Sequence, residues 1–308
     1  MDRARTRVAR VGLRRRAWGG LLAAVLAGLA VLPSPIAGAA GEVRDLLPDL
    51  AMLAPDHITV CGAPTGGTFQ TEDCPAPAAG DRWLRFDSVI QNVGNGSFRV
   101  HAFRASTAVP EMDARQLLRQ TDGRWRWIRT DAHLHWAQDE DGHPHWHTEA
   151  MERYRLFALP DPFPGGAKVG AKHGYCFFDG LLLRPDLWRA RPTPTYSFYS
   201  CGLPGQSQDA LKLTVGISVG WGDTYPWNYA GQRIDISSVP DGDYLLCLSA
   251  DPEHQFLEQR EGNNDGWARI RLTTETAPRS TVHVNVLADG TTPCAKQVPY
   301  PIPDPAES

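Results

Sequence analysis

Short apolar segments bounded by turn residues recur along most of this 308-residue chain, and this pattern constrains its fold more than any other feature. Alternating or β-branched residues in runs of this length are typical of β-strands, and Gly, Pro, Asn and Asp between them are typical of turns. The clearest segments are WLRFDSVIQNVG (83–94), ALKLTVGISVGW (210–221), WARIRLTT (267–274) and STVHVNVLA (280–288).

A further segment, GQRIDISSVPDGDYLLCLSAD (231–251), predicts two strands joined by a turn at Pro240-Asp241-Gly242. Helical periodicity is weak, and Asp113–Gln120 is the best candidate for a short helix. Many short strands separated by turns favour an all-β fold. We therefore predict a β-sandwich-like single domain over residues 41–300, with long loops and few short helices.

The two ends of the chain differ from this pattern. Seven arginines in the first 16 residues precede an apolar run, LLAAVLAGLAVLP, and the small residues IAGAAG. This order is that of a secretory signal peptide, and the apolar run is short for a membrane-spanning helix. We predict that residues 1–40 are a signal peptide and that the mature protein is secreted, without integral membrane association. Residues 301–308 are predicted to be a Pro-rich tail.

Charge and cysteine content agree with export. The chain has a net charge of −4 with histidine neutral, and removal of residues 1–40 brings it to about −10, which argues against a nucleic-acid partner. Six cysteines follow the signal region, and an even number in an exported chain indicates disulfides. Sequence alone does not choose among the connectivities; our prediction is pairing between neighbours, Cys61–Cys74, Cys176–Cys201 and Cys247–Cys294.

Three histidines, His143, His145 and His147, alternate in the motif HPHWH. Residues at i, i+2 and i+4 of a strand face the same side, so the three imidazoles would project together. Same-face neighbours lie roughly 6–7 Å apart along a strand, whereas a metal–nitrogen bond is about 2 Å, so the strand must bend to bring them to one ion. Imidazole suits copper, zinc, iron and nickel. We favour a metal site over the alternative, an exposed His-rich edge strand.

A second H-x-H, His133 and His135, lies just upstream of the triplet. It could supply a ligand, but we interpret both residues as part of a loop.

Two further segments hold residues whose chemistry could involve a metal. AKHGYCFFD (171–179) places Lys172 four residues before Cys176, and GISVGWGDTYPW (216–227) contains Asp223-Thr224-Tyr225, with Gly and Pro neighbours that predict a loop or turn. Taken singly, Lys172 would be a solvated charge and Tyr225 a packing residue with a satisfied hydroxyl. Taken with the histidines, they allow another interpretation, because copper and dioxygen can oxidise a tyrosine ring to a quinone, to which a lysine amine can add.

An ordered set of motifs over about residues 83–275 resembles the lysyl oxidase family of copper amine oxidases. Within that family, the chain resembles a secreted bacterial member. The motifs are WLRFDSVIQNVGNG, HPHWH followed by ERYRLF, KHGYC, GDTYPWNYAGQRIDISSVPDGDYLL and FLEQREGNND. Each motif is short, but they occur in the order found in the family.

The resemblance implies copper on His143, His145 and His147, and lysine tyrosylquinone formed from Lys172 and Tyr225. It also implies oxidative deamination of primary amines, either peptidyl lysine or small amines, with dioxygen as the second substrate. The products would be an aldehyde, ammonia and hydrogen peroxide.

The chain departs from the family near the copper segment. Animal members place a histidine shortly before the tyrosine of that segment, where this chain has Arg153 or its neighbours. A general base must have hydrogen-bond reach to the proton that it removes, and Glu149, Glu152 and Asp223 are the candidates.

Two other interpretations stay open at this level. One is a secreted Ig-like adhesion or binding module, and the other is a non-quinone metal-binding β-sandwich, such as an oxygenase with two histidines and the carboxylate of Glu140 or Glu149. The presence of both Lys172 and Tyr225 at motif positions counts against each. A covalent link between these two side chains would separate the amine oxidase from both alternatives.

Overall fold

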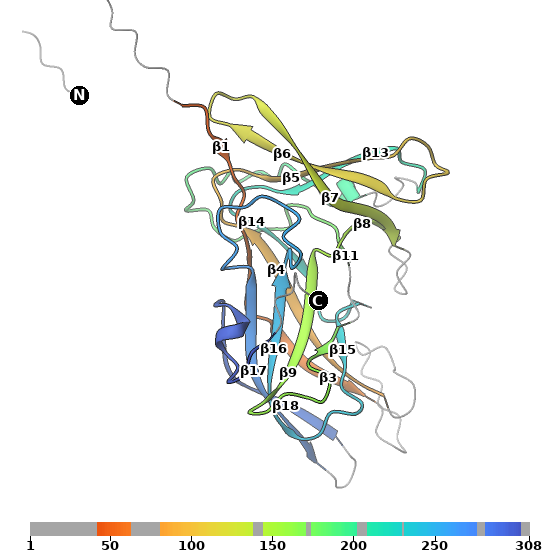
Figure 1. Ribbon diagram of the computed structural model, residues 1–308, viewed down its shortest axis with the longest axis vertical. Coiled ribbons are helices and arrows are strands. Elements are labelled where there is room, and N and C mark those ends of the chain that lie inside the picture. Colours follow the sequence, from red (N-terminus) through yellow and green to blue (C-terminus); the bar gives the residue numbers. More distant parts are fainter. Residues whose placement is uncertain are drawn as a thin grey trace, which may run out of the picture. The chain divides into compact units, whose positions relative to one another are not determined.

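β-Strands form almost all of the regular structure in the computed structural model (Figure 1), which confirms the predicted all-β class. The structure describes residues 42–62, 81–137, 144–170, 174–201, 208–229, 231–275 and 281–302. Within these ranges the helices are two short 3-10 helices, η1 (Phe198–Cys201) and η2 (Cys294–Lys296). No helix in the described ranges is long and apolar enough to cross a membrane.

The described strands form three antiparallel sheets. The seven-stranded sheet has the order β11-β8-β7-β6-β5-β13, with β1 paired to β6; its members are β1 (Asp45–Leu46), β5 (Phe98–Phe103), β6 (Met112–Gln120), β7 (Trp125–Ala137), β8 (His145–Glu149), β11 (Gly174–Tyr175) and β13 (Lys212–Ile217). The five-stranded sheet has the order β10-β9-β16-β17-β18; its members are β9 (Glu152–Leu159), β10 (Lys168–Val169), β16 (Gly242–Ala250), β17 (Asp265–Glu275) and β18 (Thr281–Gly290).

The third, six-stranded sheet is organised around β4 (Arg82–Asn92), which is the strand predicted at 83–94. Because β4 is long, it pairs with four strands along its two edges. These are β2 (Leu50–Met52), β3 (Asp56–Gly62), β14 (Trp221–Tyr225) and β15 (Arg233–Asp235), and β12 (Leu181–Leu182) extends the sheet beside β14. Side chains of β4 alternate between buried and partly buried from Phe86 to Asn92, as the period of a half-buried strand requires.

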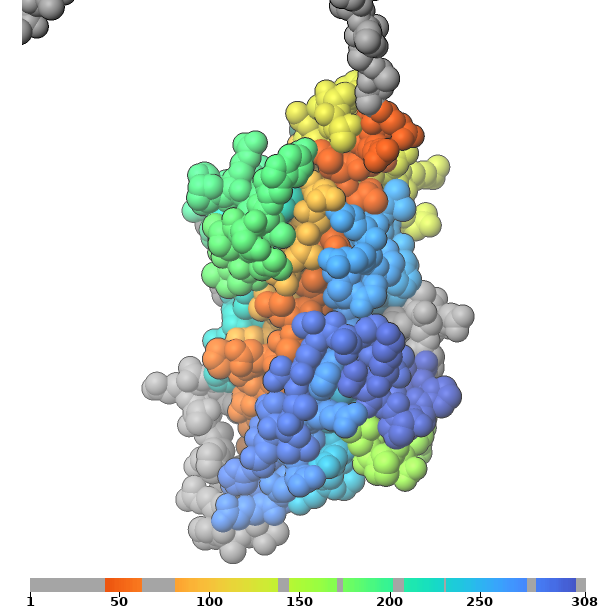
Figure 2. All heavy atoms as spheres, turned by 90° about the vertical axis from the view of Figure 1, so that its left-hand side faces the viewer, coloured from red at the N-terminus to blue at the C-terminus, as the bar shows by residue number. Residues whose placement is uncertain are grey.

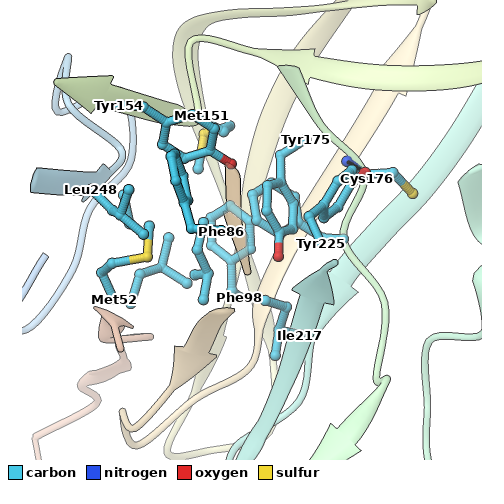
Figure 3. Close-up of a cluster of buried hydrophobic side chains, with 14 of the residues drawn as sticks. Met52, Phe86, Phe98, Met151, Tyr154, Tyr175, Cys176, Ile217, Tyr225 and Leu248 are labelled. Carbon is cyan, nitrogen blue, oxygen red and sulfur yellow. Dashed lines mark hydrogen bonds between the residues drawn. The ribbon is translucent and has the colours of Figure 1, made fainter. Parts of the chain in front are cut away.

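The main hydrophobic core draws on all three sheets. Phe86 of β4 packs edge-on against Tyr154 of β9 with ring centroids 4.8 Å apart, and Phe98 of β5 packs edge-on against Phe177 at 4.9 Å. Figure 3 shows Phe86, Tyr154 and Phe98 near Met52, Leu248 and Tyr225, which come from three other strands. Buried aromatic rings therefore join strands of all three sheets.

Three sequence-based expectations are wrong. The segment Asp113–Gln120, expected to be helical, lies in β6, because pairing with β5 and β7 overrides the helix propensity of its Ala, Arg, Gln and Leu residues. His133 and His135, interpreted as loop residues, lie in β7, and Asp223-Thr224-Tyr225, expected in a loop or turn, lies in β14. In each case, cross-strand pairing decides the conformation of a segment whose local signal is weak.

Two predicted disulfides, Cys176–Cys201 and Cys247–Cys294, are present, with Cα atoms 5.9 and 6.1 Å apart. Cys61 is also disulfide-bonded, and its predicted partner, Cys74, lies outside the described residues. Cys176 follows directly after β11, so the Cys176–Cys201 bond ties the strand that flanks His147 to η1.

Candidate active site

His145 and His147 project from the same side of β8 and are almost fully buried, at 6% and 5% exposure. Their Nε2 atoms lie 2.6 Å apart and their ring centroids 4.2 Å apart, closer than neighbouring same-face positions of a straight strand would place them. The predicted convergence of these two imidazoles is therefore present. His143, the third member of the triplet, lies outside the described residues.

β8 holds this pair between two strands. On one side it pairs with β7, with His147 opposite His135, and their ring centroids are 5.9 Å apart. The Nδ1 atom of His135 lies 2.6 Å from Glu149 Oε1, and this contact orients the ring. His135 is thus a third described histidine next to the pair. Pairing of β7 with β8 places it there, and the sequence motif alone did not predict this pairing.

On its other side β8 pairs with β11, where Gly174 lies opposite Glu149 and Tyr175 opposite Thr148. A Cβ atom at Gly174 would lie 2.7 Å from the Cβ of His147, a distance that side chains do not tolerate, so the close approach of β11 to this histidine requires glycine. Lys172 lies two positions before Gly174 and outside the described residues. The glycine in KHGYC is the sequence signal that could have predicted this contact.

Tyr225, at the end of β14, is buried, with 7% of its surface exposed, and Figure 3 shows it next to Tyr175 and Cys176. Its ring centroid lies 6.5 Å from that of His147 and 4.3 Å from that of Tyr175. The backbone N–H of Cys176 donates a hydrogen bond of 3.0 Å to the Tyr225 hydroxyl oxygen. The structure therefore brings one predicted cofactor residue and two predicted metal ligands into one cluster.

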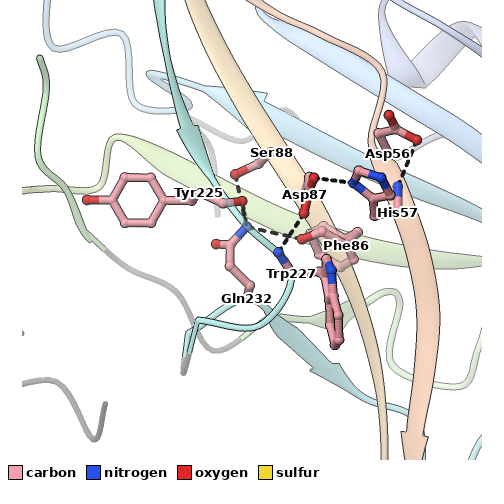
Figure 4. A network of polar contacts seen from close by, with 8 residues as sticks. All are labelled: Asp56, His57, Phe86, Asp87, Ser88, Tyr225, Trp227 and Gln232. Carbon is pink, nitrogen blue, oxygen red and sulfur yellow. Dashed lines mark hydrogen bonds and ion pairs between the residues drawn. The ribbon is translucent and has the colours of Figure 1, made fainter. Parts of the chain in front are cut away.

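A buried hydrogen-bond network fixes the backbone at Tyr225 (Figure 4). The Gln232 side-chain amide donates to the Tyr225 carbonyl at 3.1 Å, to Ser88 Oγ at 3.0 Å and to the Phe86 carbonyl at 3.3 Å. Downstream of Tyr225, the N–H of Trp227 donates to the Asp87 carboxylate at 2.6 Å, and the other oxygen of Asp87 lies 2.5 Å from His57 Nδ1. Both sides of the tyrosine are thus held by β4.

Gln232 extends the same network to a carboxylate. Its Oε1 lies 2.5 Å from the Tyr154 hydroxyl, which also lies 2.6 Å from Glu152 Oε2 and 2.9 Å from Ser88 Oγ. Burial raises the pKa of Tyr154 well above its ordinary value, and the neighbouring Glu152 charge adds to this. The single phenol proton can serve only one of these acceptors at a time.

Glu152 lines a pocket of about 740 Å³ that opens beside β8 and β9. Glu149, Arg153 and Glu253 contribute charged groups to this pocket, and Phe157, Val169 and Ile302 contribute apolar surface. The Tyr300 hydroxyl donates to the Ala158 carbonyl at 2.6 Å, and in Figure 2 the C-terminal segment, in dark blue, lies against the yellow-green segment that follows β8. The chain end therefore forms one wall.

Charges near the pocket also act on Tyr175. Its hydroxyl donates to the Asp223 carbonyl at 2.8 Å, and its pKa is raised well above the ordinary value by burial and then by the charges of Asp223 and Glu152. Tyr175 therefore contacts the Tyr225 ring and also feels the charge of Glu152. No role was predicted from the sequence for Tyr175, Tyr154 or Gln232, although these residues lie in the motifs KHGYC, ERYRLF and GDTYPWNYAGQRIDISSVPDGDYLL, respectively.

Within the described ranges, one group of three potential metal ligands is Cys247, Asp265 and Cys294. The two sulfur atoms are joined in a disulfide, and the Asp265 carboxylate accepts a hydrogen bond of 2.7 Å from the N–H of Cys294. Disulfide sulfur is not a thiolate ligand, so this group is structural.

The lysyl oxidase family model matches residues 48–282, a range that includes every predicted site residue. Lysyl oxidase homolog 4 of Bos taurus is 29% identical over 186 residues, which cover 59% of this chain and 18% of that protein. Lysyl oxidase homolog 2 of Gallus gallus is 28% identical over 234 residues, which cover 72% of this chain and 24% of that protein. The chain thus spans about a fifth to a quarter of the length of these relatives.

Proposed function

The chain belongs to the lysyl oxidase family, and from this membership and the site geometry we propose that it is a copper-dependent amine oxidase that forms lysine tyrosylquinone from Lys172 and Tyr225. The reaction converts a primary amine, dioxygen and water into an aldehyde, ammonia and hydrogen peroxide. The substrate is a small amine or the side chain of a peptidyl lysine. We further propose that residues 1–40 direct the protein to secretion.

The proposed copper ligands are His143, His145 and His147. The donor set fits the metal, because imidazole is a good ligand for copper and a buried, converging pair of Nε2 atoms needs a proton or a cation between them. Pairing with β7 and β11 holds the strand that carries the pair, so little ordering of the protein is needed when the ion binds.

The quinone would supply the carbonyl carbon that accepts the amine. The position of the Tyr225 ring, 6.5 Å from that of the proposed ligand His147, supports formation of the quinone from this tyrosine. The N–H of Cys176 holds the phenol oxygen, and Gln232 holds the backbone carbonyl of the same residue. Because both ends of the side chain are held, the ring has a single orientation relative to His147.

We assign proton transfer to Glu152. It is only 2% exposed yet lines the pocket that a substrate would enter, and the Tyr154 hydroxyl can hydrogen-bond to it in either protonation state. Of the other candidates, Glu149 is exposed and contacts His135, while Oδ1 of Asp223 accepts the N–H of Thr224. Glu152 would take the proton from the carbon that bears the amine and pass it on when the product leaves.

The pocket suits an alkyl amine. An ammonium group gains from the three carboxylates among its lining residues, Glu149, Glu152 and Glu253. Two lining arginines, Arg153 and Arg155, offset part of this gain, and Arg153 pairs with Glu253 at 3.1 Å. The alkyl chain would lie along Phe157, Val169 and Ile302.

The placement of Tyr225 beside the buried His145–His147 pair is the single observation that carries the proposal. The test is peptide mass spectrometry on protein exported in the presence of copper, before and after phenylhydrazine. We expect one cross-linked peptide containing Lys172 and Tyr225, with a mass shift after phenylhydrazine.

Two variants make this test specific. Tyr225→Phe should abolish both the cross-link and the phenylhydrazine shift, whereas Tyr229→Phe should keep both; the Tyr229 ring is also close, 5.9 Å from the Tyr225 ring centroid. Separate, unmodified peptides from protein with copper bound would contradict the amine oxidase proposal. They would favour a metal-binding or adhesion module.

A further inference from the structure

A second group of charged and aromatic side chains lies on the outward side of the seven-stranded sheet, over β13, β5, β6 and β7. Its cations are Arg99, Arg115, Arg119, Arg129 and Lys212, which we call the cationic face. Register places them close together, since Arg115 lies opposite Arg129 and Lys212 lies opposite Phe103. In Figure 1 these strands lie together at the top of the view.

Positive charge is in excess on this face. Among the described residues, none of its five cations forms an ion pair with a carboxylate, whereas Arg126 on the same strand as Arg129 pairs with Asp45 at 2.5 Å. Burial and the charges of Arg99, Lys212 and Arg115 lower the pKa of His101, which lies among them. A chain with a net charge of −4 thus carries an excess of positive charge on one sheet surface, which attracts an anionic partner.

Aromatic rings are interleaved with these cations. The guanidinium groups of Arg99 and Arg119 lie 4.7 and 5.2 Å from the ring centroid of Trp125, so that ring is already stacked. Trp127 is 52% exposed, and the ring that contacts it, His101, meets it edge to face at 5.4 Å. Arg115 in turn lies 4.9 Å from the Phe103 ring centroid. The exposed surface of Trp127 is therefore available for stacking next to guanidinium groups that form no ion pair among the described residues.

Trp127 forms one wall of a hollow of about 600 Å³. Phe103, Arg115 and Arg129 also line it, together with the carboxylates of Asp113 and Asp131. Guanidinium groups bind carboxylates and sulfates through paired hydrogen bonds. The two aspartates can accept hydrogen bonds from hydroxyl groups.

We propose that the cationic face binds an anionic polysaccharide, with a sugar ring stacked on Trp127 and the acidic groups of the polymer on the arginines. Trp127 and Phe103 lie beside Arg115 and Arg129 in one hollow, so a sugar ring and its acidic group could be bound together. A polysaccharide also presents hydroxyl groups from which the two aspartates can accept hydrogen bonds, whereas a DNA strand has no sugar hydroxyl groups along its length, although its bases would stack equally well. The proposal is independent of the amine oxidase function.

The test measures binding of the full exported chain to immobilised heparin and alginate, with dextran as the neutral polymer and oligo(dT) and polyglutamate as other anions. We expect binding to heparin or alginate that falls as salt is raised, with dextran bound at least tenfold more weakly. A preference for heparin would assign sulfate groups, and a preference for alginate would assign carboxylates.

Matched variants locate the site. Arg115→Gln with Arg129→Gln should weaken binding at least tenfold, and Trp127→Ala about threefold to tenfold. Trp188, which is 80% exposed with Arg189 stacked at 4.3 Å, supplies the controls Trp188→Ala and Arg189→Gln, which should bind as the parent does. Equal losses in the control variants, no preference over dextran, or equally tight binding of oligo(dT) or polyglutamate would overturn the proposal.

Discussion

The histidines of the candidate active site and the residues of the cationic face lie on the same seven-stranded sheet, but their polar groups differ in burial. The imidazoles of β8 and the nearby Tyr225 hydroxyl are buried and held by protein partners. On the cationic face, Arg115, Arg119 and Arg129 are exposed and form no ion pair among the described residues. Burying a polar group without a hydrogen bond is costly, whereas an exposed charge is solvated by water. Single changes should therefore have large effects in the first region and graded effects in the second.

The largest effect is expected from breaking the buried histidine pair. His147→Ala removes a proposed copper ligand and should abolish both bound copper and the phenylhydrazine adduct, with amine oxidation falling by at least about 10³-fold. Copper content by mass spectrometry, normalised to protein, is the measurement.

His283→Ala is the matched control, because His283 is an exposed histidine of β18. It should keep a full complement of copper. Copper retained at the parental level in His147→Ala would show that β8 does not supply the metal site.

Glu152→Gln should separate cofactor formation from turnover. The amide keeps the shape of the side chain and a hydrogen-bond partner for Tyr154 but cannot take a proton, so kcat should fall by about 10² to 10⁴. The phenylhydrazine adduct should still form, because the residues that build the quinone are unchanged. Glu275→Gln, at an exposed carboxylate of β17 outside this pocket, is the control and should keep kcat. A larger loss of kcat in Glu149→Gln than in Glu152→Gln would move the proton acceptor to Glu149.

Gln232→Leu should show how much the buried hydrogen-bond network contributes to the free energy of unfolding. The substitution removes the buried hydrogen bonds that Gln232 makes to the Tyr225 carbonyl, to Ser88 Oγ and to the Tyr154 hydroxyl, which should lower the free energy of unfolding by about 2–4 kcal/mol. Chemical denaturation is the measurement. Gln259→Leu is the control, because Gln259 donates a similar hydrogen bond, to the Leu47 carbonyl, from an exposed position. Comparable losses in both variants would contradict the contrast between buried and exposed polar groups.

The same contrast explains what the sequence could predict. The strands at 83–94 and 267–274 could be predicted because alternation is a local signal. The turn predicted at Pro240-Asp241-Gly242 lies a few residues earlier, where the N–H of Val239 donates to the Ile236 carbonyl, and Gly242 already begins β16. Asp113–Gln120 could not, because its strand conformation comes from β5 and β7.

The candidate site divides in the same way. His145, His147 and Tyr225 were predicted from motifs, and the structure brings them together; His143 and Lys172 stay predictions because they lie outside the described residues. The contacts of Gln232 with Tyr154 and Tyr225 join residues 78 and 7 positions away, and such long-range pairing has no signature in a single sequence.

The smallest expected effect concerns His57, an exposed residue that contacts the network from outside. Its Nδ1 lies 2.5 Å from Asp87, and this carboxylate raises the pKa of His57 above its ordinary value of 6.5 through a hydrogen bond and its charge. A raised folded-state pKa means that the protonated histidine stabilises the fold fully below about pH 6.5, and that this stabilisation is lost as pH rises through the folded pKa.

His57→Gln should therefore lower Tm relative to the parent at pH 6 and have less effect at pH 8.5. Because Asp87 also accepts the N–H of Trp227, Asp87→Asn should lower Tm at both values and remove the difference between them. Parallel curves of Tm against pH for the parent and His57→Gln would show that the His57–Asp87 contact does not stabilise the segment after Tyr225. The site would then be held by its buried partners alone.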